Sequence, residues 1–139
     1  MNRLKNNQPK SFFSFKNDTT DLVELGQFLR DTTKYRVERE WYVVFDKKSG
    51  KYMGYTKTVP NNVTIKVRNP DIILIDKKTK KLVLVIEVDG DIHRVKYTDT
   101  LERNFDYEFA KVPLLVIDLL EVDKNIFDFV TRKIQELGY

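Results

Sequence analysis

Blocks of apolar residues separated by polar turns run along this chain of 139 residues, and their spacing predicts helices near both ends. Residues 19–31 place three leucines on one helical face, and Asp18 can cap the first turn. Residues 124–138 repeat the three- and four-residue spacing of apolar side chains. Both segments are therefore expected to be amphipathic helices that pack one face against a core.

The middle of the chain has the pattern of buried strands. Residues 71–76 and 81–89 are nearly continuous runs of Ile, Leu and Val, as in central strands buried on both faces. The lysine-rich stretch 77–81 between them predicts a hairpin turn. A helix over 97–111 and a strand over 113–119 follow, and this strand–helix–strand order implies a right-handed crossover and a parallel pair.

Further extended segments precede the hairpin, at 35–46, 51–59 and 61–68. The fold class is therefore predicted to be α/β, with a mixed central β-sheet flanked by helices. In the helix over 97–111 the apolar residues are expected to face inward, namely Leu101, Phe105 and Phe109.

The hairpin carries more acids than a buried hairpin needs. If it is symmetric about Thr79, Asp71 and Glu87 lie opposite each other, and Asp89 shares their face because side chains alternate along a strand. A slip of one residue would move Asp71 to the other face. The alternative is that these acids only mark the strand ends, where solvent begins.

Three carboxylates placed this close raise one another's pKa unless a cation sits between them. The chain has no cysteine and one histidine, so zinc sites built from thiolates or several imidazoles are excluded. Oxygen ligands favour Mg²⁺ or Mn²⁺. We therefore expect Asp71, Glu87 and Asp89 to hold such an ion, together with the backbone carbonyl of Val88.

Pro70-Asp71, followed by Glu87-Val88-Asp89, resembles the core of the PD-(D/E)XK nuclease superfamily. The continuation "EVDGDIH" and "TLERNFDYEFAKVPLLVID" resembles the branch of small domains related to very-short-patch repair endonucleases. The resemblance covers roughly residues 65–120 and implies a restriction-endonuclease-like core. Asp89 stands where the superfamily motif ends in Lys, so the missing cation would have to come from elsewhere.

Basic residues that could supply this cation follow the hairpin. Arg103, on the predicted helix, is the first candidate for contact with the phosphate or the transition state, and Lys96 is the second. A solvated helix charge is the plainer interpretation of Arg103. His93 could act as a general base, a metal ligand or a donor to phosphate, or be a surface residue.

Many members of the superfamily add an acid from the first helix. Here that residue would be Glu24, with Asp21 one turn earlier as the alternative; an exposed helix carboxylate is the plainer interpretation. Glu38 and Glu40 lie in a strand that could run near the hairpin, and they form a third possibility.

The net charge of +4 comes from one end of the chain. Residues 1–16 hold four basic residues and no acid, while the remaining basic and acidic residues balance. We therefore expect a basic arm over 1–16, suited to a phosphate backbone or to solubility alone, and a single nuclease-like domain over 17–139. The insert 46–68 mixes Lys and Tyr, which suits contacts to single strands, although amphipathic strand patterning explains it nearly as well.

No stretch of the sequence is apolar enough to span a membrane or to form a signal peptide, so a soluble, intracellular protein is expected. The residue usage, rich in Lys, Asn and Asp and poor in Gly, would suit an A·T-rich genome such as that of a virus or mobile element. A homodimer is plausible because a small monomer has little surface for sequence recognition.

The sequence thus predicts a magnesium- or manganese-dependent endonuclease that hydrolyses DNA phosphodiester bonds. One alternative is a nuclease-fold domain that has lost catalysis and binds nucleic acid or a protein partner. Another is a metal-independent RNA-processing fold.

Overall fold

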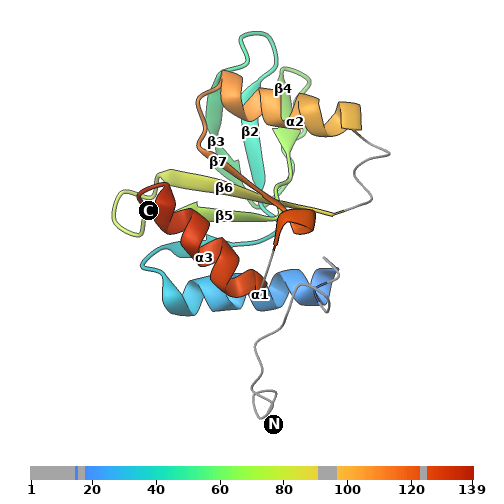
Figure 1. The fold of residues 1–139 in the computed structure, drawn as a ribbon. Helices are drawn as coiled ribbons and strands as arrows, with labels where there is room; N and C mark the ends of the chain where they lie inside the picture. Colours follow the sequence, from blue (N-terminus) through green and yellow to red (C-terminus); the bar gives the residue numbers. More distant parts are fainter. Residues whose placement is uncertain (1–14, 16–17, 91–96, 123–124) are drawn as a thin grey trace.

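The computed structural model describes residue 15 and residues 18–90, 97–122 and 125–139. In the described chain six β-strands lie between the first two α-helices, and one more strand lies between the second helix and the third (Figure 1). The elements are α1 (Thr19–Thr32), β1 (Arg36–Glu38), β2 (Tyr42–Asp46), β3 (Tyr52–Thr56), β4 (Ile65–Arg68), β5 (Ile72–Ile75), β6 (Leu82–Asp89), α2 (Tyr97–Phe109), β7 (Leu114–Asp118), the 3₁₀ helix η2 (Leu119–Glu121) and α3 (Ile126–Glu136).

The strands form two sheets. The larger sheet has the order β1-β5-β6-β7, in which β1–β5 and β5–β6 are antiparallel and β6–β7 are parallel across the α2 crossover. This arrangement confirms the predicted mixed α/β sheet. The smaller sheet has the order β3-β2-β4 and is antiparallel throughout.

The single strand expected over 35–46 is wrong, because the chain divides it between the two sheets. β1 pairs with β5 in the larger sheet, whereas β2 is the middle strand of the smaller one. Glu40, between them, has φ of 61°, a left-handed conformation that interrupts an extended run. The break redirects the chain from one sheet to the other.

The hairpin β5–β6 is buried on both faces, as predicted. On one face alternate residues such as Leu74 and Ile86 pack with α1 and α3. On the other face Ile73 and Val85 pack with β2 and with Tyr107 of α2. Figure 1 shows α1 and α3 on one side of the larger sheet and α2 with the smaller sheet on the other. Phe15, within the predicted arm, is buried in the first of these clusters.

The predicted helix over 97–111 is present, but its inward face is wrong. Leu101, Phe105 and Phe109 are 50%, 59% and 58% exposed, whereas Tyr107 is fully buried. The helix is oriented by Arg103, which pairs with acids of β6 on the same side as Tyr107. The ion pairs of Arg103 and the burial of the Tyr107 ring therefore go together with this rotation of α2, and the apolar stripe faces outward.

Helix α1 begins as predicted, because the Asp18 side chain accepts a hydrogen bond from the Asp21 backbone N–H at 2.9 Å. Within the part of the chain that the structure describes, no helix is long and apolar enough to cross a membrane.

Candidate active site

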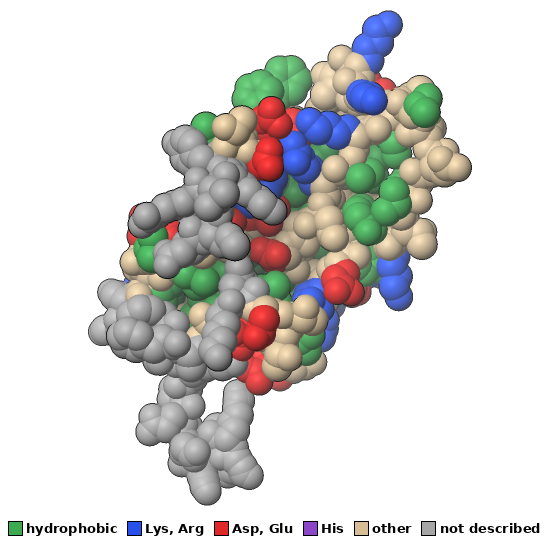
Figure 2. All heavy atoms as spheres, turned by 90° about the vertical axis from the view of Figure 1, so that its right-hand side faces the viewer, with side chains coloured by type: hydrophobic (Ala, Val, Ile, Leu, Met, Phe, Trp, Pro, Cys, Tyr) green, Lys and Arg blue, Asp and Glu red, His purple; other side chains and the backbone are tan. Residues whose placement is uncertain are grey.

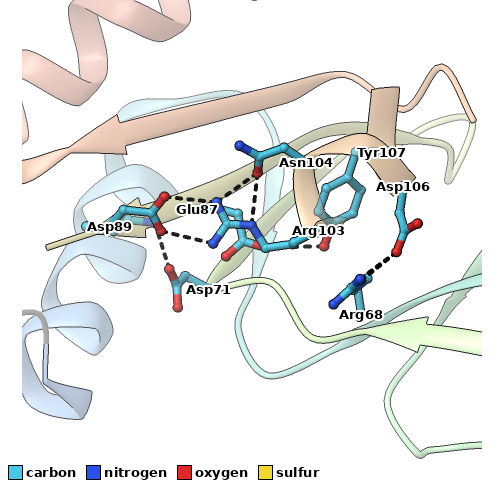
Figure 3. Close-up of polar contacts among 9 residues, drawn as sticks. Arg68, Asp71, Glu87, Asp89, Arg103, Asn104, Asp106 and Tyr107 are labelled. Atoms are coloured by element: carbon cyan, nitrogen blue, oxygen red, sulfur yellow. Dashed lines mark hydrogen bonds and ion pairs between the residues drawn. The ribbon is translucent and has the colours of Figure 1, made fainter. Parts of the chain in front are cut away.

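At the end that carries the acids, the hairpin has the register that the sequence predicts, whereas nearer the turn the register shifts between Leu74 and Ile75, so that Ile75 pairs with Leu82. Ile72 pairs with Ile86 and Leu74 with Leu84, so the next step toward the strand end sets Asp71 opposite Glu87. Glu87 and Asp89 lie on the face that α2 covers, as the alternation along β6 requires. The three acids therefore gather at one end of the hairpin (Figure 3). The lysine-rich turn lies at the other end.

Arg103 of α2 lies among these acids. Its guanidinium donates two hydrogen bonds to the Asp89 carboxylate, at 3.0 and 2.9 Å, and its Nε lies 3.7 Å from Glu87. Asn104 accepts from the same guanidinium at 2.8 and 3.0 Å, which fixes its orientation. Burial opposes the charge of Arg103, but Asp89 and Glu87 outweigh it and raise the pKa of Arg103. The two-pronged geometry is the strong form of a charge-assisted pair.

Glu87 is the most strongly perturbed of the acids. Its side chain is buried, and this burial raises its pKa to about 8, against an ordinary value of 4.5. The Arg103 charge lowers that pKa, while the charges of Asp71 and Asp89 raise it. The Tyr107 hydroxyl donates to Glu87 Oε2 at 3.3 Å. The Arg103 guanidinium and the Tyr107 phenol thus do not offset the effect of burial on the pKa of Glu87. With a pKa of about 8, Glu87 holds a proton at neutral pH.

Asp71 is held by the backbone of the facing strand. Its Oδ2 accepts a hydrogen bond from the Val88 N–H at 2.7 Å. Burial raises the pKa of Asp71, the Val88 N–H lowers it, and the charge of Asp89 raises it again. Asp89 therefore acts on the pKa of Asp71, and both Asp71 and Asp89 act on the pKa of Glu87.

Sequence reasoning missed Arg39, which follows β1 directly. Its side chain is only 17% exposed and its aliphatic part packs over Gly26 of α1, where an added Cβ would lie 3.3 Å from Arg39 Cδ. Among the described residues its buried Nε finds no hydrogen-bond partner. Arg39 also contributes to lowering the pKa of Asp71. The dense charge in "RVERE", in a strand expected near the hairpin, was the only sequence signal for it.

The other predicted residues have different outcomes. His93 and Lys96 lie outside the described residues. Glu24 is half-buried on α1, whereas its alternative Asp21 is only 4% exposed, and a place for either in the site stays a prediction. Glu38 is paired with Arg36 at 2.8 Å.

The donor set has the chemistry of a site for a hard divalent ion. Asp71, Glu87 and Asp89 supply oxygens, and burial, with a smaller effect from the charges of Asp71 and Asp89, raises the pKa of Glu87 to about 8. As the described side chains stand, no three acids or imidazoles converge into a metal-holding group. Arg103 is instead the cation held by Asp89. An ion at Asp71 and Glu87 would replace the Glu87 proton, so the residues fit the expected group.

Comparisons of the chain with family models, with curated proteins and with solved structures gave no match.

Proposed function

We propose that this chain is a metal-dependent endonuclease that hydrolyses DNA phosphodiester bonds, on a restriction-endonuclease-like core. The observation that carries the proposal is the gathering of Asp71, Glu87 and Asp89 around Arg103 at one end of the buried hairpin. Three acids and one arginine in a largely buried site are a costly arrangement for stability alone. Strongly perturbed groups of this kind cluster at functional sites.

In this proposal Asp71 and Glu87, with the Val88 carbonyl and Asp89, hold Mg²⁺ or Mn²⁺. The bound ion would supply an activated water and offset charge on the phosphoryl group. Residues of the chain orient the acids and stabilise the developing charge. The Val88 N–H orients Asp71, Asn104 and Asp89 fix the Arg103 guanidinium, and that guanidinium faces the negative charge that develops on the phosphate.

Two further residues have proposed roles. Arg39 is the second cation of the site and takes the part of the lysine that the motif lacks. Its side chain is 17% exposed and lies 3.7 Å from Glu40, and its charge lowers the pKa of Asp71. Its buried Nε makes no hydrogen bond to the described residues. His93 is proposed to relay a proton, as the resemblance and its position after the acids suggest.

A second candidate function is a nucleic-acid-binding domain without catalysis. The two-pronged contact of Arg103 with Asp89 favours it, because this contact neutralises one acid of the site without a metal ion. Nicking of supercoiled plasmid separates the two functions. The proposed function predicts nicking in Mg²⁺ or Mn²⁺ that stops in EDTA. DNA binding without nicking in either ion would favour the second candidate.

Variants test the assignment of the residues. Asp71→Asn and Glu87→Gln keep shape and remove a charge, and each is expected to abolish nicking. Glu121→Gln, at an exposed position on η2, is the matched control and should nick normally. Arg39→Gln should slow nicking and Arg39→Lys should restore part of the rate. Equal rates for wild type and Arg39→Gln would remove Arg39 from the mechanism.

A further inference from the structure

A pair of basic residues on β4 converges on one acid of α2. Lys66 and Arg68 are two residues apart, so their side chains leave the strand on the same face. Lys66 Nζ lies 2.9 Å from Asp106 Oδ2, and both Nε and Nη2 of Arg68 lie 2.7 Å from the same oxygen. Three N–H donors thus surround a single oxygen. The group carries two positive charges and one negative charge.

This group adjoins the proposed active site. Asp106 is next to Tyr107, whose hydroxyl donates to Glu87, and the Arg68 charge acts on the pKa of that phenol. Figure 3 shows Arg68 and Asp106 beside Tyr107, on the side of α2 that carries Arg103. Acidic and basic side chains also lie next to one another on the face shown in Figure 2. A nucleic acid strand lying across the acids would meet the basic pair next.

A role in stability alone explains only part of this arrangement. One cation would be enough to pair Asp106 and join β4 to α2, and the second adds a surplus positive charge. The Lys66 side chain is 45% exposed and that of Arg68 is 23% exposed, so a ligand can reach both. The half-exposed Lys66 contact is of the kind that contributes little to the free energy of folding.

We propose that Lys66 and Arg68 bind a phosphate of the DNA backbone next to the scissile one, and that the Asp106 carboxylate takes the place of that phosphate in the free protein. A phosphate oxygen accepts the same N–H donors that Asp106 Oδ2 accepts here. Asp106 thereby lowers the affinity for DNA while it keeps the two cations in position. The location of the strand rests on the proposed function.

Charge variants of the full-length protein test this proposal. Affinity for a short fluorescein-labelled DNA duplex, and for one of its single strands, is measured by anisotropy in EDTA. Asp106→Asn is expected to tighten binding roughly twofold to fivefold, because two cations lose a competing anion. The double variant Lys66→Gln/Arg68→Gln should weaken binding. For the duplex it should also reduce the salt slope by up to about 0.9 over about 50 to 200 mM salt, because the two cations together hold one phosphate contact.

The matched control is Lys77→Gln/Lys78→Gln, which removes the same charge at the hairpin turn, far from the acids. Its binding should change less than that of the β4 double variant. Equal losses in the two double variants, or a folded Asp106→Asn protein with unchanged or weaker binding, would overturn the proposal. If Asp106→Asn does not fold, the comparison of the two double variants decides alone.

The comparison of the duplex with the single strand identifies the form of DNA that binds. The proposal commits to a backbone phosphate, so the β4 double variant must weaken binding of the duplex, the single strand or both. Unchanged affinity for both forms would overturn the proposal. Because binding is measured in EDTA, it does not depend on cleavage. If the affinities change as expected but plasmid is not nicked, the proposed nuclease is rejected and the phosphate site is retained. If plasmid is nicked but the affinities do not change, the phosphate site is rejected and the nuclease is retained.

Discussion

Replacing Glu87 by Gln should change the stability of the protein in a way that depends on pH. Glu87 keeps its proton in the folded state up to about pH 8, whereas in the unfolded chain it releases it near 4.5. Between these values the folded state binds more protons, so the free energy of unfolding falls as pH rises. Below 4.5 the contribution of Glu87 is fully present, and above about 8 it has been lost.

The size of the effect follows from the same two values. The difference between about 8 and 4.5, at about 1.4 kcal/mol for each pH unit, amounts to at most about 5 kcal/mol. Gln cannot ionise, yet its amide oxygen can still accept from the Tyr107 hydroxyl. Glu87→Gln should therefore match the wild type in stability below pH 4.5 and exceed it by up to about 5 kcal/mol above pH 8.

Urea unfolding in EDTA across this pH range measures the difference directly, and Glu121→Gln serves as the exposed control. The control should differ little from the wild type at every pH. A Glu87→Gln variant with the same stability offset at both ends of the range would refute the reasoning. So would a variant that is less stable than the wild type above pH 8, because the buried carboxylate would then be a stabilising charge.

Three other changes have definite expected outcomes. Asp71→Asn should raise the melting temperature in EDTA, because it removes a buried charge beside Asp89; a lower melting temperature would mean that the carboxylate is structural. Arg103→Gln should destabilise the protein by about 3–5 kcal/mol in urea at pH 8, since it leaves buried acids uncompensated, and a loss below about 1 kcal/mol would contradict this. Deleting residues 1–10 should reduce the salt slope of duplex binding by up to about 0.9 for each lost contact and leave single-turnover cleavage intact. An unchanged salt slope would show that this segment does not contact the DNA.

The sequence by itself determined the central hairpin and the gathering of its acids. Runs of Ile, Leu and Val favour strands buried on both faces of a sheet, and symmetry about Thr79 predicts the pairing of Ile72 with Ile86 that the structure has. The register shift between Leu74 and Ile75, nearer the turn, is set by the tertiary structure. The pairing beyond this shift sets Asp71 against Glu87, as predicted. The crossover from β6 through α2 to β7 follows for a similar reason, because a parallel neighbour requires a long connection.

The tertiary structure alone decided which side of α2 faces the sheet. By apolar spacing Leu101, Phe105 and Phe109 should be inside, but they are exposed. Two acids at the end of β6 are buried, and the free energy of leaving them without a cation outweighs the burial of an apolar stripe. Arg103 therefore turns inward, in agreement with its choice as the first candidate cation of the site, whereas the apolar spacing of the helix favours the opposite rotation.

The position of Arg39 and the break of the chain at Glu40 were likewise not decided locally. The segment 35–46 has the composition of one continuous strand, and only the pairing of β1 with β5 and of β2 with β3 and β4 divides it. Contacts between residues far apart in sequence set that division and carry the Arg39 side chain over α1 toward Asp71. The sequence placed the acids and named Arg103 as a candidate cation, whereas Arg39 was found only in the tertiary structure, because it comes from an element that packing alone brings to the hairpin.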